Sequence, residues 1–200
     1  MEAREAPAAS EARGLSRLCV MLSGGGRTML NLADAIDRGD LPATVALVVA
    51  SKECPGAERA RERGLRTVVV PGVIPRETLP ALLDEHRIDW VVLAGYLKIV
   101  QIPEAYRGRV VNIHPALLPD FGGPGMYGGR VHAAVLASGA THSGCTVHLC
   151  DDEYDRGPIL LQRTCPVLEG DDVHTLAARV FEEEMRAFPE ALRRLIEAGH

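Results

Sequence analysis

The sequence contains no C-x-x-C pair, and its five cysteines are odd in number. This usage argues against a disulfide framework and favours free thiols, so we expect a reducing, cytoplasmic location. No apolar run approaches the roughly 20 residues that a membrane-spanning helix needs. Basic residues are scattered through a chain with a net charge of -5, which argues against a general nucleic-acid surface. We therefore expect no membrane partner and no nucleic-acid partner.

Residues 1–16 are rich in Ala, Glu, Arg and Pro and lack the apolar core of a secretory signal. We expect them to be a mobile leader ahead of a single domain over residues 17–200, in which we find neither an internal repeat nor a linker. The 200 residues, 46% of them hydrophobic and 24% charged, suit one globular domain with a sizeable core. A monomer or a homodimer is expected.

Apolar runs alternate with helical patterns along the whole domain. The expected strands are residues 18–22, 44–50, 67–70, 89–95, 109–113, 141–150 and 159–167. The expected helices follow residue 28 and then cover 57–63, 76–86, 131–137 and a long segment from 172 past Pro189. This alternation with short connections predicts an α/β fold: a doubly wound, mostly parallel, Rossmann-like sheet of about seven strands with helices on both faces.

A glycine-rich segment, residues 23–28, connects the first expected strand to the first helix. Backbone N–H groups and the helix dipole converge at such a point, so it is suited to bind an anion, and phosphate is the natural candidate. The segment is not a Walker A loop, and Met29 occupies the third-glycine position of a G-x-G-x-x-G motif. From the residues alone, phosphate binding and a plain tight turn both stay open.

Three polar residues stand near expected strand ends. Asn112 and His114 are two positions apart on one strand, so their side chains point to the same face. Asp155 lies in an acidic loop before another apolar run. An amide donor, an imidazole and a carboxylate are the groups that stabilise an oxyanion and move a proton. An Asn-x-His pair alone, however, is more often structural.

Two other patterns allow alternative interpretations. Residues 141–150 contain two His and two Cys, but their spacing fits no usual tetrahedral zinc site, and we predict no metal. The apolar residues Leu97, Ile99 and Val100 follow the most hydrophobic strand. They form either a wall for a flat ring ligand at the carboxyl end of the sheet or ordinary core.

Three separated motifs give the chain a family resemblance. Residues 112–119 (NIHPALLP), 144–148 (GCTVH) and 152–159 (DEYDRGPI) resemble the folate-dependent formyltransferases, and most of all their glycinamide ribonucleotide branch. The similarity covers about residues 17–190. It implies transfer of the formyl group of 10-formyltetrahydrofolate, as co-substrate, to the amino group of glycinamide ribonucleotide in purine biosynthesis, without a metal.

The resemblance also implies roles for individual residues. The catalytic group is Asn112, His114 and Asp155. Residues implied to bind the ribonucleotide and its phosphate are Gly24, Gly25, Gly26, Arg27, Thr28, Arg76 and Glu184. Residues implied to bind the folate are Leu97, Lys98, Ile99, Val100, Asn112, Cys150, Asp151 and Asp155.

The chain departs from the family pattern at three places. Arg27-Thr28 stands where the phosphate loop often has Ser-Asn, and the loop at residues 120–129 is longer than in the commonest versions. Phe181 replaces a polar residue that contacts phosphate, so we expect that contact to be absent.

By the same resemblance, the acceptor amine attacks the formyl carbon. Asn112 and a protonated His114 then donate to the oxyanion, while Asp155 keeps His114 cationic. The alternatives are hydrolysis of 10-formyltetrahydrofolate, formylation of another amine, and a ligand-binding module without catalysis. Relatives that hydrolyse this folate usually carry an additional regulatory domain, and those that formylate methionyl-tRNA carry a basic extra domain. The acidic balance of this chain and the shortness of its leader disfavour both.

Overall fold

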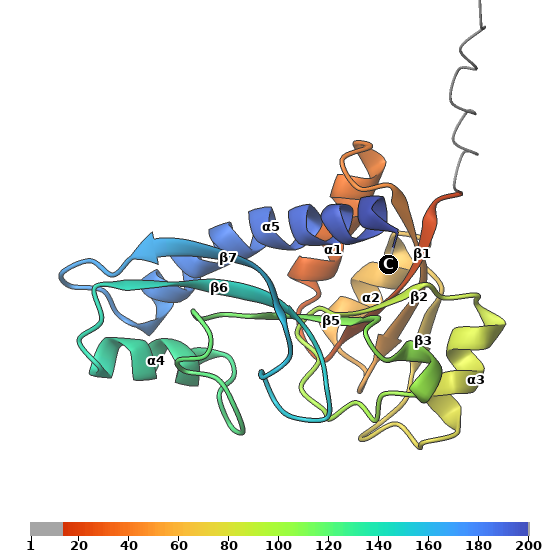
Figure 1. Ribbon diagram of the computed structural model, residues 1–200, viewed down its shortest axis with the longest axis horizontal. Coiled ribbons are helices and arrows are strands. Elements are labelled where there is room, and N and C mark those ends of the chain that lie inside the picture. Colours follow the sequence, from red (N-terminus) through yellow and green to blue (C-terminus); the bar gives the residue numbers. More distant parts are fainter. Residues whose placement is uncertain (1–13, 200) are drawn as a thin grey trace, which may run out of the picture.

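The computed structural model describes residues 14–199, which form one seven-stranded sheet covered by helices (Figure 1). The strands are β1 (Ser16–Leu22), β2 (Ala43–Ala50), β3 (Thr67–Val69), β4 (Trp90–Leu93), β5 (Val110–His114), β6 (His142–Leu149) and β7 (Ile159–Pro166). The helices are α1 (Arg27–Asp37), α2 (Pro55–Glu62), α3 (Thr78–Glu85), α4 (Gly129–Ala137) and α5 (Val173–Ala198), with a 3-10 turn at Glu104–Tyr106. Most of the predicted leader lies outside the described residues; its last residue, Ser16, opens β1.

The strand order is β3-β2-β1-β4-β5-β6-β7. The first five of these strands run parallel to their neighbours, whereas β6 is antiparallel to β5 and β7 is antiparallel to β6. The predicted mostly parallel sheet of about seven strands is therefore confirmed. The strand direction first reverses between β5 and β6. These two strands carry the residues at the centre of the site described below.

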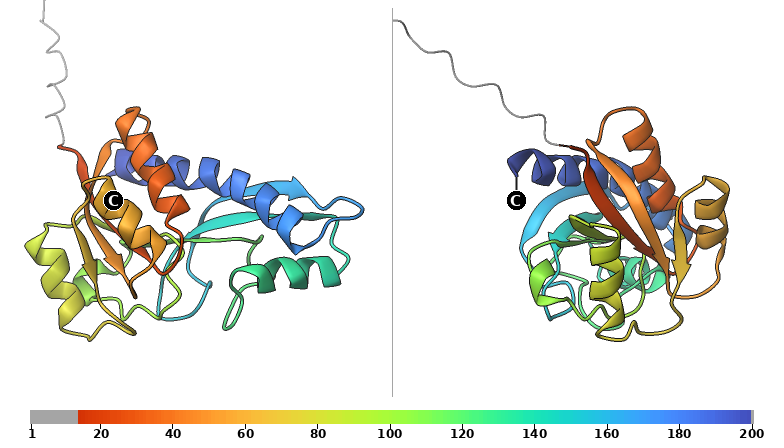
Figure 2. Two further views of the ribbon diagram at one scale, coloured as in Figure 1. Left: turned by 180° about the vertical axis from the view of Figure 1, so that it is seen from behind. Right: turned by 90° about the vertical axis from the view of Figure 1, so that its right-hand side faces the viewer.

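Helices cover both faces, as β1 illustrates. Leu18 and Val20 belong to a core cluster with residues of α1, α2, α4 and α5. The alternate residues Cys19 and Met21 belong to a second cluster with residues of α3. Side chains of a strand alternate between faces, so one continuous apolar run fills both cores. Accordingly, α1 and α3 lie on opposite sides of the parallel strands (Figure 2).

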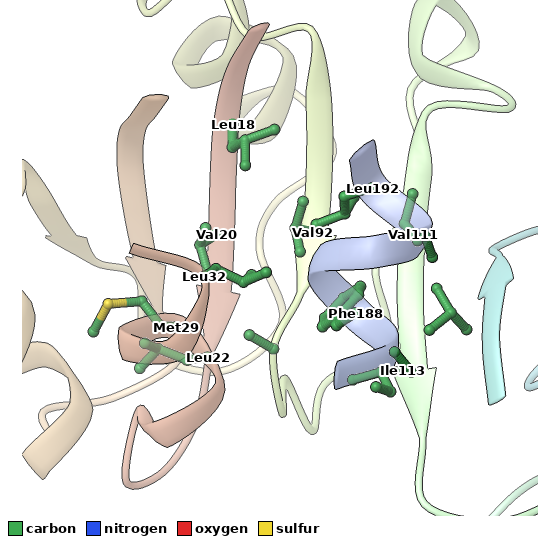
Figure 3. Close-up of a cluster of buried hydrophobic side chains, with 14 of the residues drawn as sticks. Leu18, Val20, Leu22, Met29, Leu32, Val92, Val111, Ile113, Phe188 and Leu192 are labelled. Atoms are coloured by element: carbon green, nitrogen blue, oxygen red, sulfur yellow. The ribbon is translucent and has the colours of Figure 1, made fainter. Parts of the chain in front are cut away.

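The long helix α5 closes the larger core. Asp172 is its N-cap: the carboxylate accepts the backbone N–H groups of His174 and Thr175, both at 2.8 Å. The helix continues through Pro189, as predicted. Phe188 is fully buried and points toward the side chains of β4 and β5 (Figure 3). Burying a side chain of this size stabilises the fold by about 1.5–3 kcal/mol.

One predicted helix begins later than expected. The predicted helix over residues 76–86 corresponds to α3, which starts at Thr78 because a turn from Pro75 to Thr78, with a 3.0 Å hydrogen bond, precedes it. Arg76 therefore lies in a connecting loop and not on the helix. None of the helices within residues 14–199 is both long and apolar enough to span a bilayer.

Candidate active site

The pairing of β5 with β6 sets the centre of the site. In this antiparallel register Asn112 lies opposite His148, and His114 lies opposite Thr146. The Nδ2 atom of Asn112 is 3.1 Å from Nε2 of His148. The other ring nitrogen of His148, Nδ1, is 2.9 Å from the backbone carbonyl of Leu149 and donates to it. In the tautomer whose only proton is on Nδ1, Nε2 accepts from Asn112, whereas in the doubly protonated ring Nε2 would donate to Asp155 at 3.5 Å.

His114 is held by the loop that follows β5. Its Nε2 is 2.8 Å from the Phe121 carbonyl and donates to it, while Nδ1 faces Oδ2 of Asp155 at 3.6 Å. Burial lowers the pKa of His114, and the charge of Asp155 and the Phe121 carbonyl only partly oppose this. The free protein therefore favours a neutral imidazole. The expected protonated donor to an oxyanion requires a further proton and release of the Phe121 contact.

Asp155 connects the two histidines. Its side chain is only 10% exposed, and its Oδ1 lies 3.5 Å from Nε2 of His148. Oδ2 accepts the backbone N–H of Gly123 at 2.9 Å. Burial alone would raise the pKa of Asp155, but the neighbouring histidines and the Gly123 N–H together lower it. Asp155 is thus a carboxylate at neutral pH, as a group that stabilises an imidazolium must be.

The segment after His114 is anchored to β6 and β7. The hydroxyl of Thr146 accepts the Leu118 N–H at 3.0 Å and donates to the Ala116 carbonyl at 2.7 Å. A β-carbon on Gly122 would lie 2.5 Å from a Leu118 methyl and 3.2 Å from Cβ of Asp155. The loop therefore packs closely against Asp155, and a larger residue at position 122 would require the Leu118 side chain to move.

Asn112, His114, His148 and Asp155 line a cavity of about 560 Å³. The cavity brings together the predicted site residues Gly24, Gly25, Gly26, Arg27, Thr28, Leu97, Lys98, Ile99, Val100, Asn112, His114, Cys150, Asp151, Asp155 and Glu184. Arg76 is the exception: it is exposed and does not line the cavity. A predicted contact from Arg76 would need movement of its loop.

The glycine-rich segment forms one end of this cavity. Gly26, the N-cap of α1, has a left-handed backbone with φ 75°, and a β-carbon on it would lie 2.7 Å from Cα of Gly56. The N–H of Gly56 binds the Gly24 carbonyl at 2.9 Å. Within residues 14–199 no side chain caps α1, so the N–H groups of its first turn stay available to a ligand.

A carboxyl and a cation stand beside this segment. Glu184 on α5 lines the cavity, and its burial raises its pKa to about 7 against the opposing charge of Arg27. The guanidinium carbon of Arg27 lies 3.9 Å from the centroid of the Phe181 ring. Phe181 also lines the cavity, so the position where we expected a lost polar contact is occupied by an aromatic support for Arg27.

The opposite end of the cavity is apolar. Leu97 is 57% exposed and Ile99 is 45% exposed, and both lie beyond the end of β4. The backbone N–H of Leu97 donates to the buried hydroxyl of Ser23 at 2.9 Å. Ser23 is the first residue of the glycine-rich segment, so one hydroxyl links this segment to the apolar end of the cavity. Exposed apolar side chains at a cavity mouth suit a flat ring ligand.

Sequence reasoning missed two histidines that line the cavity, His148 and His132. The signal for His148 was its place in the GCTVH motif, two residues after Thr146 on the same strand face. His132 on α4 is buried, and its Nδ1 has no hydrogen-bond partner among the described residues. Burial lowers the pKa of His132, with the charge of His114 as a smaller cause.

Comparison with known proteins places the chain in a family. The profile of the formyl transferase family matches residues 16–192. The chain therefore belongs to the formyl transferase family. A solved structure of glycinamide ribonucleotide transformylase 1 from Symbiobacterium toebii is 36% identical, with a TM-score of 0.85 over 92% of this chain and 89% of that chain. The fold shared with that structure agrees with the sheet described above.

Curated relatives are of similar kind but longer. The phosphoribosylglycinamide formyltransferase of Vigna unguiculata chloroplasts is 42% identical over an alignment of 191 residues that covers 90% of this chain and 61% of the relative. The chloroplast protein of the same description from Arabidopsis thaliana is 41% identical over 90% of this chain and 65% of its own length. The chain thus spans less than two thirds of these relatives.

Proposed function

We propose that this chain transfers the formyl group of 10-formyltetrahydrofolate to the amino group of glycinamide ribonucleotide. One observation carries the proposal: Asn112, His114 and Asp155 converge in a single cavity between an N–H-rich end and an apolar end. The N–H groups after Gly26 suit the phosphate of the acceptor, and Glu184 suits its ribose hydroxyls. Leu97 to Val100 and Cys150 to Asp155 suit the folate.

The reaction needs an oxyanion site and a path for one proton. The acceptor nitrogen attacks the formyl carbon, and the carbonyl π electrons move to oxygen. Asn112 donates its second Nδ2 hydrogen to this oxyanion. Losing one such donor typically costs about 3–4 kcal/mol of transition-state stabilisation. The carbon–N10 bond then breaks, and the proton lost by the acceptor amine ends on N10 of the folate.

His114 and Asp155 serve the charge and the proton. When the substrates displace the Phe121 carbonyl, the Nε2–H of His114 becomes free to donate to the oxyanion. Protonation at Nδ1 gives an imidazolium directly beside the Asp155 carboxylate, which stabilises it. Asp155 also relays the amine proton toward the leaving nitrogen. We place this activity in the cytoplasm, in a monomer or a homodimer.

The test is a spectrophotometric assay of folate deformylation with 10-formyl-5,8-dideazafolate, run with and without glycinamide ribonucleotide. We expect turnover only when the ribonucleotide is present, with the formyl group recovered on it by mass spectrometry. Equal turnover without the ribonucleotide would show a hydrolase instead. Absence of turnover in both would contradict the proposal and favour another acceptor or a binding role.

A further inference from the structure

We propose that Phe181 positions the Arg27 guanidinium as a clamp for a phosphate ester, and that this pair makes the phosphate group of the acceptor a determinant of specificity. The inference rests on the proposed function and adds to it a positioning residue and a basis for selectivity. It concerns a pair that joins two elements far apart in the sequence, α1 and α5.

The geometry leaves the hydrogen-bond donors of Arg27 free. Its guanidinium carbon lies 3.9 Å from the centroid of the Phe181 ring, within the range of a cation–π contact. A stacked guanidinium uses only its face, so the N–H groups around its edge remain directed outward in their plane. Both residues line the cavity beside the glycine-rich segment. Stacking thus limits the rotamers of a long side chain without using its donors.

The charge of Arg27 has no partner at ion-pair distance within residues 14–199. Other arginines of the chain do have such partners: Arg63 binds two carboxylates, and Arg179 binds Asp171. Arg27 is moreover the first residue of α1, where the positive end of the helix dipole disfavours a cation. An unpaired cation at this position is suited to a ligand that carries two negative charges, as a phosphate monoester does.

Glu184 limits what this end of the cavity accepts. It lies three residues after Phe181 on the same helix and also lines the cavity, but it is not within ion-pair distance of Arg27. Its carboxyl would repel an anion placed next to it and accept hydroxyl hydrogens instead. A ligand with a phosphate near Arg27 and hydroxyl groups near Glu184, as in a sugar phosphate, satisfies both groups.

The experiment compares two substitutions of the ring with two acceptors. Phe181→Leu keeps an apolar side chain but removes the aromatic face, whereas Phe181→Trp keeps a face. We expect Phe181→Leu to raise KM for glycinamide ribonucleotide by about three- to thirty-fold, the range that a cation–π contact supports, with little change in kcat. Phe181→Trp should restore most of the loss. The KM for the folate should stay unchanged in both variants.

The acceptor without phosphate, glycinamide ribonucleoside, distinguishes clamping from general packing. We expect wild type, Phe181→Leu and Arg27→Met to use it equally poorly. Arg38→Met is the matched control, because Arg38 lies at the other end of α1 in an exposed pair with Asp40. It should leave both acceptors unaffected. An equal loss with both acceptors, or no change in KM with Phe181→Leu, would overturn the inference.

Failure of the proposed function is distinguishable from failure of this inference. If wild type transfers no formyl group, calorimetry of inorganic phosphate binding still tests whether Phe181 and Arg27 form a phosphate clamp, because it needs no catalysis. Wild type and Phe181→Trp should bind phosphate several-fold more tightly than Phe181→Leu, and Arg27→Met should bind it weakest. Equal affinity in all four proteins would refute the clamp.

Discussion

Asn112 and His148 meet side chain to side chain across two antiparallel strands, with 3.1 Å between Nδ2 and Nε2. The Leu149 carbonyl holds a proton of His148 on Nδ1, so Nε2 of the singly protonated ring accepts and gives the amide group of Asn112 a defined orientation. Its oxygen is turned away from His148. The second hydrogen of Nδ2 has no partner among the described residues and is available to an oxyanion.

Asn112→Asp should reduce kcat/KM about 10²- to 10³-fold, because a carboxylate of the same shape replaces the donor and repels an oxyanion. Steady-state kinetics with both substrates measures this. A thermal melt checks that the fold is intact. Near-normal turnover in the folded variant would remove Asn112 from the catalytic group.

Asp155→Asn should shift the pH dependence of the reaction. The carboxylate raises the pKa of His114 against the larger lowering caused by burial, so its removal lowers that pKa further. In the proposed mechanism the transition state needs protonated His114, so activity should fall at a lower pH in the variant than in wild type. We expect a loss of about 10²- to 10⁴-fold at neutral pH. Profiles of kcat/KM between pH 5.5 and 9 that run parallel would contradict this.

Gly56→Ala should selectively impair the end of the cavity that the glycine-rich segment forms. The new methyl group would stand 2.6 Å from the Gly24 carbonyl oxygen, so the glycine-rich segment must move. We expect a higher KM for the ribonucleotide, an unchanged KM for the folate and a lower melting temperature. Glu58→Ala, an exposed change on the same helix, is the control. If the KM values for the ribonucleotide and the folate rise together, the effect of Gly56 is not confined to the end of the cavity that the glycine-rich segment forms.

Glu184→Gln should change how stability depends on pH. Burial raises the pKa of Glu184 in the folded state to about 7, above its ordinary value of 4.5. Wild type therefore loses stability relative to the variant as pH rises from about 4.5 through about 7, and the difference is constant outside this window. Urea unfolding of both proteins at pH 4.5, 6 and 8 measures it. If the difference in free energy of unfolding between the variant and wild type does not grow with pH, the raised pKa of Glu184 is contradicted.

Much of the fold follows from local patterns. Continuous apolar runs predicted buried strands, and a period of two placed Asn112 and His114 on one face of β5. The glycine-rich segment predicted the N–H-lined end. These features depend on residues close in the sequence, where periodicity and backbone sterics decide the structure.

The features that could not be predicted from the sequence depend on contacts between residues that are far apart in the chain. The partner of Asn112 is set by the register of β5 against β6, which no local pattern fixes. The protonation preference of His114 depends on its burial and on the Phe121 carbonyl. Phe181 lies more than 150 positions from Arg27, and only the packing of α5 against α1 brings the ring under the guanidinium. Arg76 was misplaced because the start of α3 was predicted two residues early.

The helix α5 has a mechanical consequence for the molecule. Its 26 residues extend for about 39 Å, and it packs on α1 at the parallel part of the sheet and on β6, β7 and α4 at the antiparallel part (Figure 1). Neither part can open without exposing apolar side chains of this shared helix. We therefore expect the parallel and antiparallel parts to unfold together, with amides along α5 exchanging hydrogen only in the global opening event.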